Sequence, residues 1–293
     1  GPAMVRPRKP LASHAFALTM AALFAGQSRT AKGQPNNACS TESTRGRAFL
    51  RVEDVRKTAL SNIMSMQALA ELVEAGVHFG HQTKRWNPKM KPFILESRNQ
   101  IHILNLEETV KQIEAAAEFL SELARKGKRI LFVGCKRQAQ EAVKEAAEAC
   151  GQFYVNHRWL GGTLTNNETI KKSIARWAYL DDIEKKPEFK MMSKKELAAL
   201  NREKAKLERN LKGVRAMDRL PDAVVIVDSA REHIAVHEAQ RLGIPIVALV
   251  DTNANPDLVA YPIAANDDAI RSIRIILQKL IDPIIVGMAE ARR

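Results

Sequence analysis

Cysteine, aromatic residues and long apolar runs are all scarce in this sequence of 293 residues. Its three cysteines, Cys39, Cys135 and Cys150, show neither the paired CxxC spacing of a zinc site nor the density of a secreted disulfide scaffold. No run of about 18 apolar residues is present that could span a bilayer. Because hydrophobic residues still make up 45% of the chain, a sizeable core can form without disulfides. We therefore expect a soluble globular protein with reduced thiols in a cytosol-like compartment.

Motifs for nucleotide binding and catalysis are also missing. The chain has neither the GxGxxG fingerprint nor a phosphate-binding loop of the GxxxxGKS or GxxxxGKT type. His233 and His237 lie one helical turn apart, but Ile234 stands where a metalloprotease helix carries its general-base glutamate. No Ser-His-Asp or Cys-His set has diagnostic local spacing. We expect no enzymatic activity, and a metal-dependent enzyme on an α/β fold is the alternative.

Positive charge is what the sequence has in excess. Lysine and arginine number 46 against 33 aspartates and glutamates, for a net charge of +13 and a pI near 9.8, which favours a polyanionic partner. Residues 1–63 hold ten basic residues and three acidic ones. Because they lack a periodic apolar face, we predict a disordered extension before a domain at 64–293. A secretory signal or an organellar transit peptide is the alternative for this segment.

From Met66 onward the pattern becomes that of an α/β protein. Residues 66–76 predict an amphipathic helix that ends at Gly76. Short apolar runs then alternate with helical patterns, and continuous apolar strands are typical of a sheet that is buried on both faces. We predict a doubly wound, mostly parallel sheet. The predicted strands are 101–104, 129–134, 152–155, 223–228 and 245–251.

A charged stretch from Glu168 to Arg219 is too long to be an ordinary crossover. Its pattern predicts a hairpin of two helices, each of about 18 residues and roughly 27 Å long. From Lys171 to Arg219 it holds fifteen basic and eight acidic residues. We predict an arm that contacts nucleic acid, while a merely solvated face is the alternative. The candidate contacts are Lys171, Lys172, Arg176, Lys204 and Arg209.

The segment from Gly76 to Ile94, GVHFGHQTKRWNPKMKPFI, places basic residues around a tryptophan. Phosphates together with a stacked base suit this combination, since cations meet the backbone and an aromatic ring meets a base. A surface loop with its tryptophan in the core is the alternative. The candidate contacts are Lys84, Arg85, Trp86, Lys89 and Lys91.

The segment RWLGGTLTN, from Arg158 to Asn166, directly follows the third predicted strand. Doubly wound folds bind ligands at this carboxyl edge of the sheet. Gly161 and Gly162 would let the backbone approach a phosphate, although the missing fingerprints disfavour a nucleotide.

Carboxylates end two predicted strands and open the last helix. Asp228 and Asp251 follow strands, and Asp267 and Asp268 come just before a helical pattern. Together with His81 they form a candidate site for a structural divalent cation. The alternative is that the last two aspartates only favour the helix N-terminus.

Met66 to about Arg292 resembles bacterial-type proteins of the ribosomal protein S2 family, from the small ribosomal subunit. The resemblance is carried, in order and spacing, by five segments: 76–94, GCKRQAQ (134–140), 158–166, 221–253 and ANDDAIRSI (265–273). Ala265 and Cys135 depart from the family's common glycine and threonine, and residues 1–63 have no counterpart.

This resemblance implies a flavodoxin-like α/β domain with an inserted helical hairpin. It also implies binding to small-subunit rRNA between head and body, a neighbouring contact with ribosomal protein S1, and no catalysis. With the segments that carry it, Lys136, Arg137 and Arg158 join the expected RNA contacts. The location is then the cytoplasmic ribosome, or an organellar ribosome if residues 1–63 are a transit peptide.

Overall fold

The computed structural model describes residues 69–184 and 193–291. The predicted extension at 1–63 and its boundary lie outside these residues. Residues 69–74 form the end of the helix predicted before Gly76. Within the described ranges, no helix is both long and apolar enough to cross a membrane.

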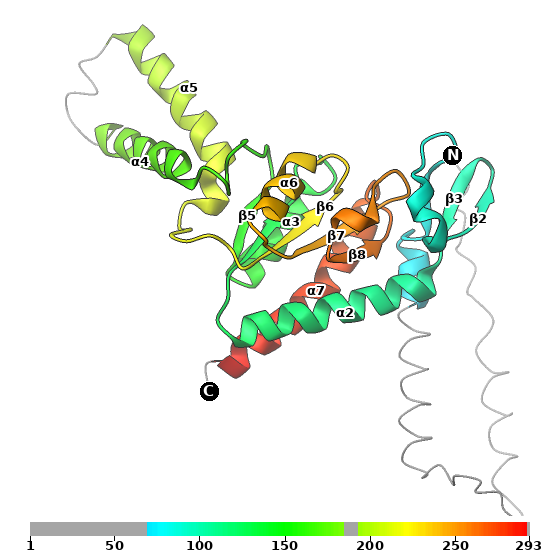
Figure 1. Cartoon of the computed structure of the whole chain (residues 1–293). Coiled ribbons are helices and arrows are strands. Elements are labelled where there is room, and N and C mark those ends of the chain that lie inside the picture. Colours follow the sequence, from blue (N-terminus) through cyan, green and yellow to red (C-terminus); the bar gives the residue numbers. More distant parts are fainter. Residues whose placement is uncertain (1–68, 185–192, 292–293) are drawn as a thin grey trace, which may run out of the picture. The chain divides into compact units, whose positions relative to one another are not determined.

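A sheet of five parallel strands forms the centre of the described chain (Figure 1). Its order is β5-β4-β6-β7-β8, so the first strand lies between the second and the third, as in flavodoxin-like folds. The predicted doubly wound α/β fold is therefore confirmed. The strands are β4 (Ile130–Val133), β5 (Phe153–Val155), β6 (Ala223–Val227), β7 (Ile246–Val250) and β8 (Tyr261–Ala264).

Helices cover both faces of this sheet. One face packs on α2 (Leu106–Arg125), α3 (Gln140–Ala149) and α7 (Ile270–Ala291). The other packs on α6 (His233–Arg241) and on the base of the helical hairpin. Side chains alternate between the two faces along each strand, as the two-residue period requires. Every residue of β4, β6 and β7 is buried, which explains their continuous apolar sequence.

The strand predicted at 101–104 is confirmed, but its placement in the parallel sheet was wrong. The run at 101–104 is β3 (Ile101–Leu104), which belongs to a separate antiparallel sheet with β1 (Phe79–Gln82) and β2 (Ile94–Arg98). Asn99 and Gln100 join β2 to β3 with positive φ angles of 51° and 61°, the geometry of a two-residue hairpin turn. Because the sequence lacks the usual Asn-Gly at this turn, the hairpin was missed.

Strand β8 is the fifth parallel strand and was also missed. It lies at the sheet edge and contains Pro262, a residue that sequence patterns exclude from central strands. Its pairing with β7 nevertheless brings the residues that follow Ala264 beside those that follow Val250. The position of this strand therefore decides which side chains meet at the carboxyl edge of the sheet.

The predicted hairpin is confirmed as α4 (Asn167–Glu184) and α5 (Lys194–Leu211), each of 18 residues. A capping box between Ser193 and Glu196 begins α5, because each side chain pairs with the other's backbone N–H. Trp177 and Leu180 of α4 are buried at the interface of the two helices and the core. In Figure 1 the hairpin lies beside β5.

Candidate nucleic-acid interface and carboxylate cluster

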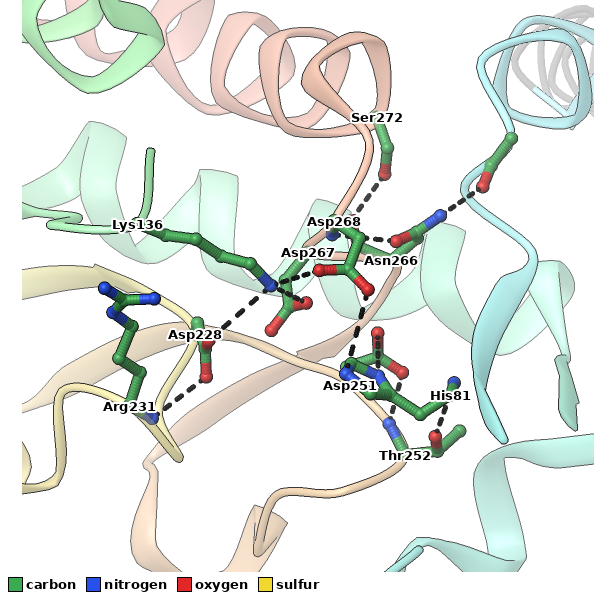
Figure 2. A network of polar contacts seen from close by, with 11 residues as sticks. His81, Lys136, Asp228, Arg231, Asp251, Thr252, Asn266, Asp267, Asp268 and Ser272 are labelled. Atoms are coloured by element: carbon green, nitrogen blue, oxygen red, sulfur yellow. Dashed lines mark hydrogen bonds and ion pairs between the residues drawn. The ribbon is translucent and has the colours of Figure 1, made fainter. Parts of the chain in front are cut away.

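The carboxyl ends of four parallel strands bring charged side chains together (Figure 2). Lys136 follows β4 and Asp228 follows β6, which places both at the point where the strand order reverses. Asp251 follows β7, and Asp267 and Asp268 lie between β8 and α7. The predicted gathering of carboxylates at one sheet edge is confirmed.

Lys136 is buried and neutralises part of this cluster. Its Nζ lies 2.6 Å from Oδ1 of Asp267, 2.6 Å from Oδ1 of Asp268 and 3.7 Å from Oδ2 of Asp228. Burial alone would lower the pKa of Lys136, but these carboxylates outweigh burial and raise it. The ammonium group is turned inward and held by carboxylates, which makes Lys136 a poorer candidate for contacting RNA than the exposed cations.

His81 reaches the cluster from the small sheet because β1 packs tightly against the end of β7. A Cβ on Gly80 would lie 2.6 Å from Cγ2 of Thr252, so only glycine permits this approach. The His81 backbone N–H donates to Oγ1 of Thr252 at 2.9 Å. Its Nδ1 lies 2.8 Å from Oδ2 of Asp251, and this carboxylate raises the pKa of His81.

Asp267 carries the most perturbed carboxyl group of the cluster. Burial, followed by the charges of Asp228 and Asp251, raises its pKa to about 7, although Lys136 opposes the shift. Its Oδ2 is buried and accepts no hydrogen bond. The same holds for Oδ2 of Asp251, whose short contact with Nδ1 of His81 lacks hydrogen-bond geometry. One possible ligand atom from each of His81, Asp251 and Asp267 lies within 4.8 Å of the other two.

Asn266 and Asp268 fix how α7 begins beside this cluster. The Asn266 backbone N–H donates to the Val77 carbonyl at 3.1 Å, and its side-chain amide donates to the Gly76 carbonyl at 3.0 Å. Its own Oδ1 accepts from the Asp268 N–H at 2.9 Å. These bonds link the last helix to the segment that carries His81, although the two lie near opposite ends of the described sequence.

The loop after β5, residues 158–166, is organised by a carboxylate that sequence analysis missed. Glu238 of α6 is buried, and its Oε1 accepts from the Trp159 ring N–H at 3.1 Å and the Gly162 N–H at 2.7 Å. Its Oε2 accepts from the Leu164 N–H at 3.0 Å and from both the N–H and hydroxyl of Thr165, at 3.1 and 3.2 Å. The Gly162 N–H, one of the two glycine backbone groups expected to approach a phosphate, is therefore already occupied by the protein's own carboxylate.

A sequence signal for Glu238 existed. It lies on the apolar face of α6, beside the buried Ala235 and Ala239. An acid at such a position requires partners, since an unpaired buried carboxylate is costly. Its partners come from 73 to 79 residues earlier in the chain, so the sequence alone did not reveal them.

The basic loop that follows β1, residues 84–91, is anchored while its charges face outward. Met90 is fully buried and packs into the core. The Asn87 N–H donates to the Thr252 carbonyl at 2.7 Å. Trp86 keeps 39% of its surface exposed, which favours the stacking interpretation over a core position. The exposed cations of the loop are Lys84, Arg85, Lys89 and Lys91.

The candidate cations differ in whether a carboxylate of the protein already pairs with them. Arg176 forms a two-pronged pair with Glu203 at 3.0 and 3.2 Å, and Lys204 lies 2.9 Å from Asp181. Lys89, in the basic loop, lies 2.5 Å from Asp257. The remaining candidates are exposed and make no ion pair within the described residues: Arg137, Arg158, Lys171, Lys172 and Arg209.

The two cysteines in the described part of the chain are free and buried. Burial raises the pKa of Cys135 to about 12, with the Glu232 carboxylate adding to the effect, and that of Cys150 to about 11. Both thiols are therefore protonated and poor nucleophiles at neutral pH.

Comparison with known protein families gives one finding. Residues 72–287, well over half of the chain, match the family model described as ribosomal protein S2. The matched range contains the basic loop, the carboxylate cluster, the Glu238 loop and the helical hairpin.

Proposed function

The chain belongs to the ribosomal protein S2 family and is thus a protein of the small ribosomal subunit, and from this premise we propose that it binds small-subunit rRNA as a structural constituent without catalysing a reaction. The observation that carries the proposal is the basic loop at 84–91, with four exposed cations around a half-exposed tryptophan. Cations of this kind contact phosphates, and such contacts position a protein on RNA.

The proposed RNA contacts comprise the basic loop, two further exposed arginines and the hairpin. Carboxylates already engage Arg176 and Lys204, so these two hairpin residues would have to exchange partners to meet a phosphate. We expect the exposed cations without such partners to contribute more. The full set is Lys84, Arg85, Trp86, Lys89, Lys91, Arg137, Arg158, Lys171, Lys172, Arg176, Lys204 and Arg209.

Sedimentation with small ribosomal subunits tests this function. The protein should co-sediment at low salt and dissociate as the salt concentration rises, because phosphate contacts release counterions. Failure to co-sediment at low salt, together with metal-dependent turnover of a phosphorylated substrate, would instead favour the enzyme hypothesis.

The proposed location is the cytoplasmic ribosome, and the proposed neighbours are other small-subunit proteins, ribosomal protein S1 among them. Support for the S1 contact comes from the family resemblance alone. An organellar ribosome is the alternative if residues 1–63 act as a transit peptide. Fusion of residues 1–63 to a fluorescent protein distinguishes the two locations, since a transit peptide would direct the fusion to an organelle.

Changing Trp86 to Ala should weaken rRNA binding by roughly 1–3 kcal/mol, the usual value of a stacked base. The free energy of unfolding should change by less than about 1 kcal/mol, because the side chain is well exposed. Filter binding and chemical denaturation measure the two effects separately. A loss of stability as large as that of a buried tryptophan, about 3–5 kcal/mol, would remove Trp86 from the proposed contacts.

We also propose that the carboxylate cluster holds a structural divalent cation, with Nδ1 of His81, Oδ2 of Asp251 and Oδ2 of Asp267 as ligands. These three side chains converge, and Oδ2 of Asp267 is buried without a hydrogen-bond partner, which supports the fit. One imidazole nitrogen with two carboxylate oxygens suits Zn²⁺ better than Mg²⁺, since magnesium prefers oxygen ligands alone. When bound, the cation would offset part of the charge of the four carboxylates, of which three pair with Lys136 and the fourth, Asp251, pairs with His81.

Adding Zn²⁺ to the metal-free protein should raise its stability by about 2.7 kcal/mol at a hundredfold excess over the dissociation constant. Asp267→Asn should abolish this gain, whereas Asp218→Asn, an exposed carboxylate outside the cluster, should retain it. Thermal denaturation and metal analysis after dialysis measure both. An equal gain in the Asp267→Asn protein would exclude this ligand set.

A further inference from the structure

A polar hollow of about 270 Å³ lies where β5 ends, between the core and the base of the hairpin. Residues of α3, β5 and α5 line it. This is the carboxyl end of an edge strand, on the same side of the sheet as the switch point where doubly wound folds bind ligands. It is distinct from the carboxylate cluster, with which it shares no residue.

One face of α5 and the turn after it form the first wall. Ala205, Glu208, Arg209 and Lys212 are spaced so that they share one side of a helix. Ala205 has a small side chain and leaves space, while Arg209 and Lys212 bring two cations to the hollow. Glu208 is the only carboxylate among the residues that line it.

The second wall comes from the core. Lys144 of α3 supplies a third cation, and Asn156 and His157 follow β5. The Asn156 amide donates to the Gln140 carbonyl at 3.1 Å, which fixes this side chain and leaves its oxygen for a ligand. Partial burial, followed by the charge of Arg209, lowers the pKa of His157, which favours the neutral ring, and a neutral imidazole can donate one hydrogen bond and accept another.

The two walls are held at a fixed separation. Gly213, which follows α5, packs directly on Tyr154 of β5, and a Cβ at this position would lie 2.1 Å from the Tyr154 carbonyl oxygen. The close contact sets where the last turn of α5 lies against the sheet. Since Arg209 belongs to this turn and Lys212 directly follows it, the hollow is a preformed feature of the fold.

The cations around the hollow lack ion-pair partners, whereas some other cations of the hairpin and its flank have them. Arg176 pairs with Glu203, and Arg215 lies 3.2 Å from Asp181. Within the described residues, Lys144, Arg209 and Lys212 form no ion pair. Three unpaired cations opposite one carboxylate leave the hollow positive, and it therefore favours an anionic ligand.

We propose that this hollow seats one phosphate group of the small-subunit rRNA backbone, held jointly by Lys144, Arg209 and Lys212. Arg209 can donate two parallel hydrogen bonds to phosphate oxygens, and the lysines add charge. The volume exceeds that of a phosphate, which leaves space for the adjoining ribose beside His157 and Asn156. The inference rests on the proposed rRNA binding, and it places one phosphate contact at the base of the hairpin.

Salt dependence of rRNA binding tests the proposal. The variant Lys144→Gln, Arg209→Gln, Lys212→Gln should lower the magnitude of the log-affinity against log-salt slope by about 0.7–0.9, the value for one phosphate. Each single change should weaken binding severalfold, and the triple loss should be smaller than the product of the three single losses, because one ligand is shared. The matched control Lys194→Gln, Lys195→Gln, Lys206→Gln removes three charges of the same hairpin outside the hollow and should retain most of the affinity.

Three results would overturn the proposal. Equal slopes for the triple variant and the wild-type protein would show that the hollow does not meet RNA. A fall of roughly 2–3 in the slope, with multiplicative single losses, would mean three separate phosphates. In the third result, micromolar AMP or inorganic phosphate shifts the NMR signals of the His157 ring to saturation, while the triple variant binds rRNA as the wild type does. The hollow would then bind a free phosphorylated ligand and not the rRNA. Failure of the wild-type protein to bind rRNA is a different result, and it would overturn the proposed function itself.

Discussion

Replacing Glu238 by Gln is expected to lower the free energy of unfolding by roughly 3–5 kcal/mol, among the largest effects of any single change in this protein. The two carboxylate oxygens accept five hydrogen bonds from Trp159, Gly162, Leu164 and Thr165. An amide would turn an NH₂ group toward one set of donors. Buried N–H groups would then lose their partners, and each such loss costs about 1–3 kcal/mol.

Chemical denaturation of the Glu238→Gln protein at neutral pH measures this loss. The matched control is Glu118→Gln at an exposed position on α2, which should change the stability little.

The pH dependence of the stability difference gives a second signature. Burial would raise the pKa of Glu238, but the hydrogen bonds from the loop outweigh burial and lower it. A carboxyl group with a lowered pKa stabilises the folded state above its unfolded pKa of about 4.3, and the stabilisation is lost as the pH falls through the folded value. The difference between wild type and variant should therefore shrink below about pH 4. A constant difference down to pH 3 would contradict this account.

Replacing Lys136 by Met should cost about 3 kcal/mol, near the lower limit for breaking a buried ion pair. The change leaves Asp267 and Asp228 buried without their lysine. The loss stays near the lower limit because Asp268 is exposed to solvent and because Asp267, with a pKa of about 7, can take up a proton. For the same reason the loss should be larger at pH 8 than at pH 6, where Asp267 is mostly protonated.

The double variant Lys136→Met, Asp267→Asn tests the origin of this effect. If the cost arises from an uncompensated buried charge, removing that charge should restore much of the stability lost in Lys136→Met. Denaturation of the wild type, both single variants and the double variant in metal-free buffer completes the cycle. Additive losses would show that Lys136 contributes through packing of its aliphatic chain and not through its charge.

Local patterns in the sequence predicted most of the fold. Four of the five strands of the parallel sheet are continuous apolar runs, and the two 18-residue helices of the hairpin follow from a helical period with many charges. The features that were missed have weak local signals. Strand β8 contains a proline at the sheet edge, and the β2–β3 turn uses Asn99 and Gln100 in place of the usual glycine pair.

The candidate site was predicted in part, and the reason lies in the range of each interaction. Carboxylates at strand ends must meet at one edge of a parallel sheet, so Asp228, Asp251 and Asp267 could be grouped from the sequence. Their partners could not be assigned in the same way. Lys136 meets Asp267 across 131 residues of chain, and Glu238 meets Gly162 across 76.

The preference for a polyanionic partner was predicted from the amino-acid sequence alone, because an excess of thirteen positive charges does not depend on how the chain folds. Which cations remain available to that partner is decided only by the tertiary structure. Lys136 and Arg209 look equivalent in the sequence, yet Lys136 is buried and its charge is neutralised by carboxylates. Arg209 lines the hollow instead, and it has no ion-pair partner among the described residues. The physical reason is that a charge acts through its surroundings, and long-range packing assembles those surroundings.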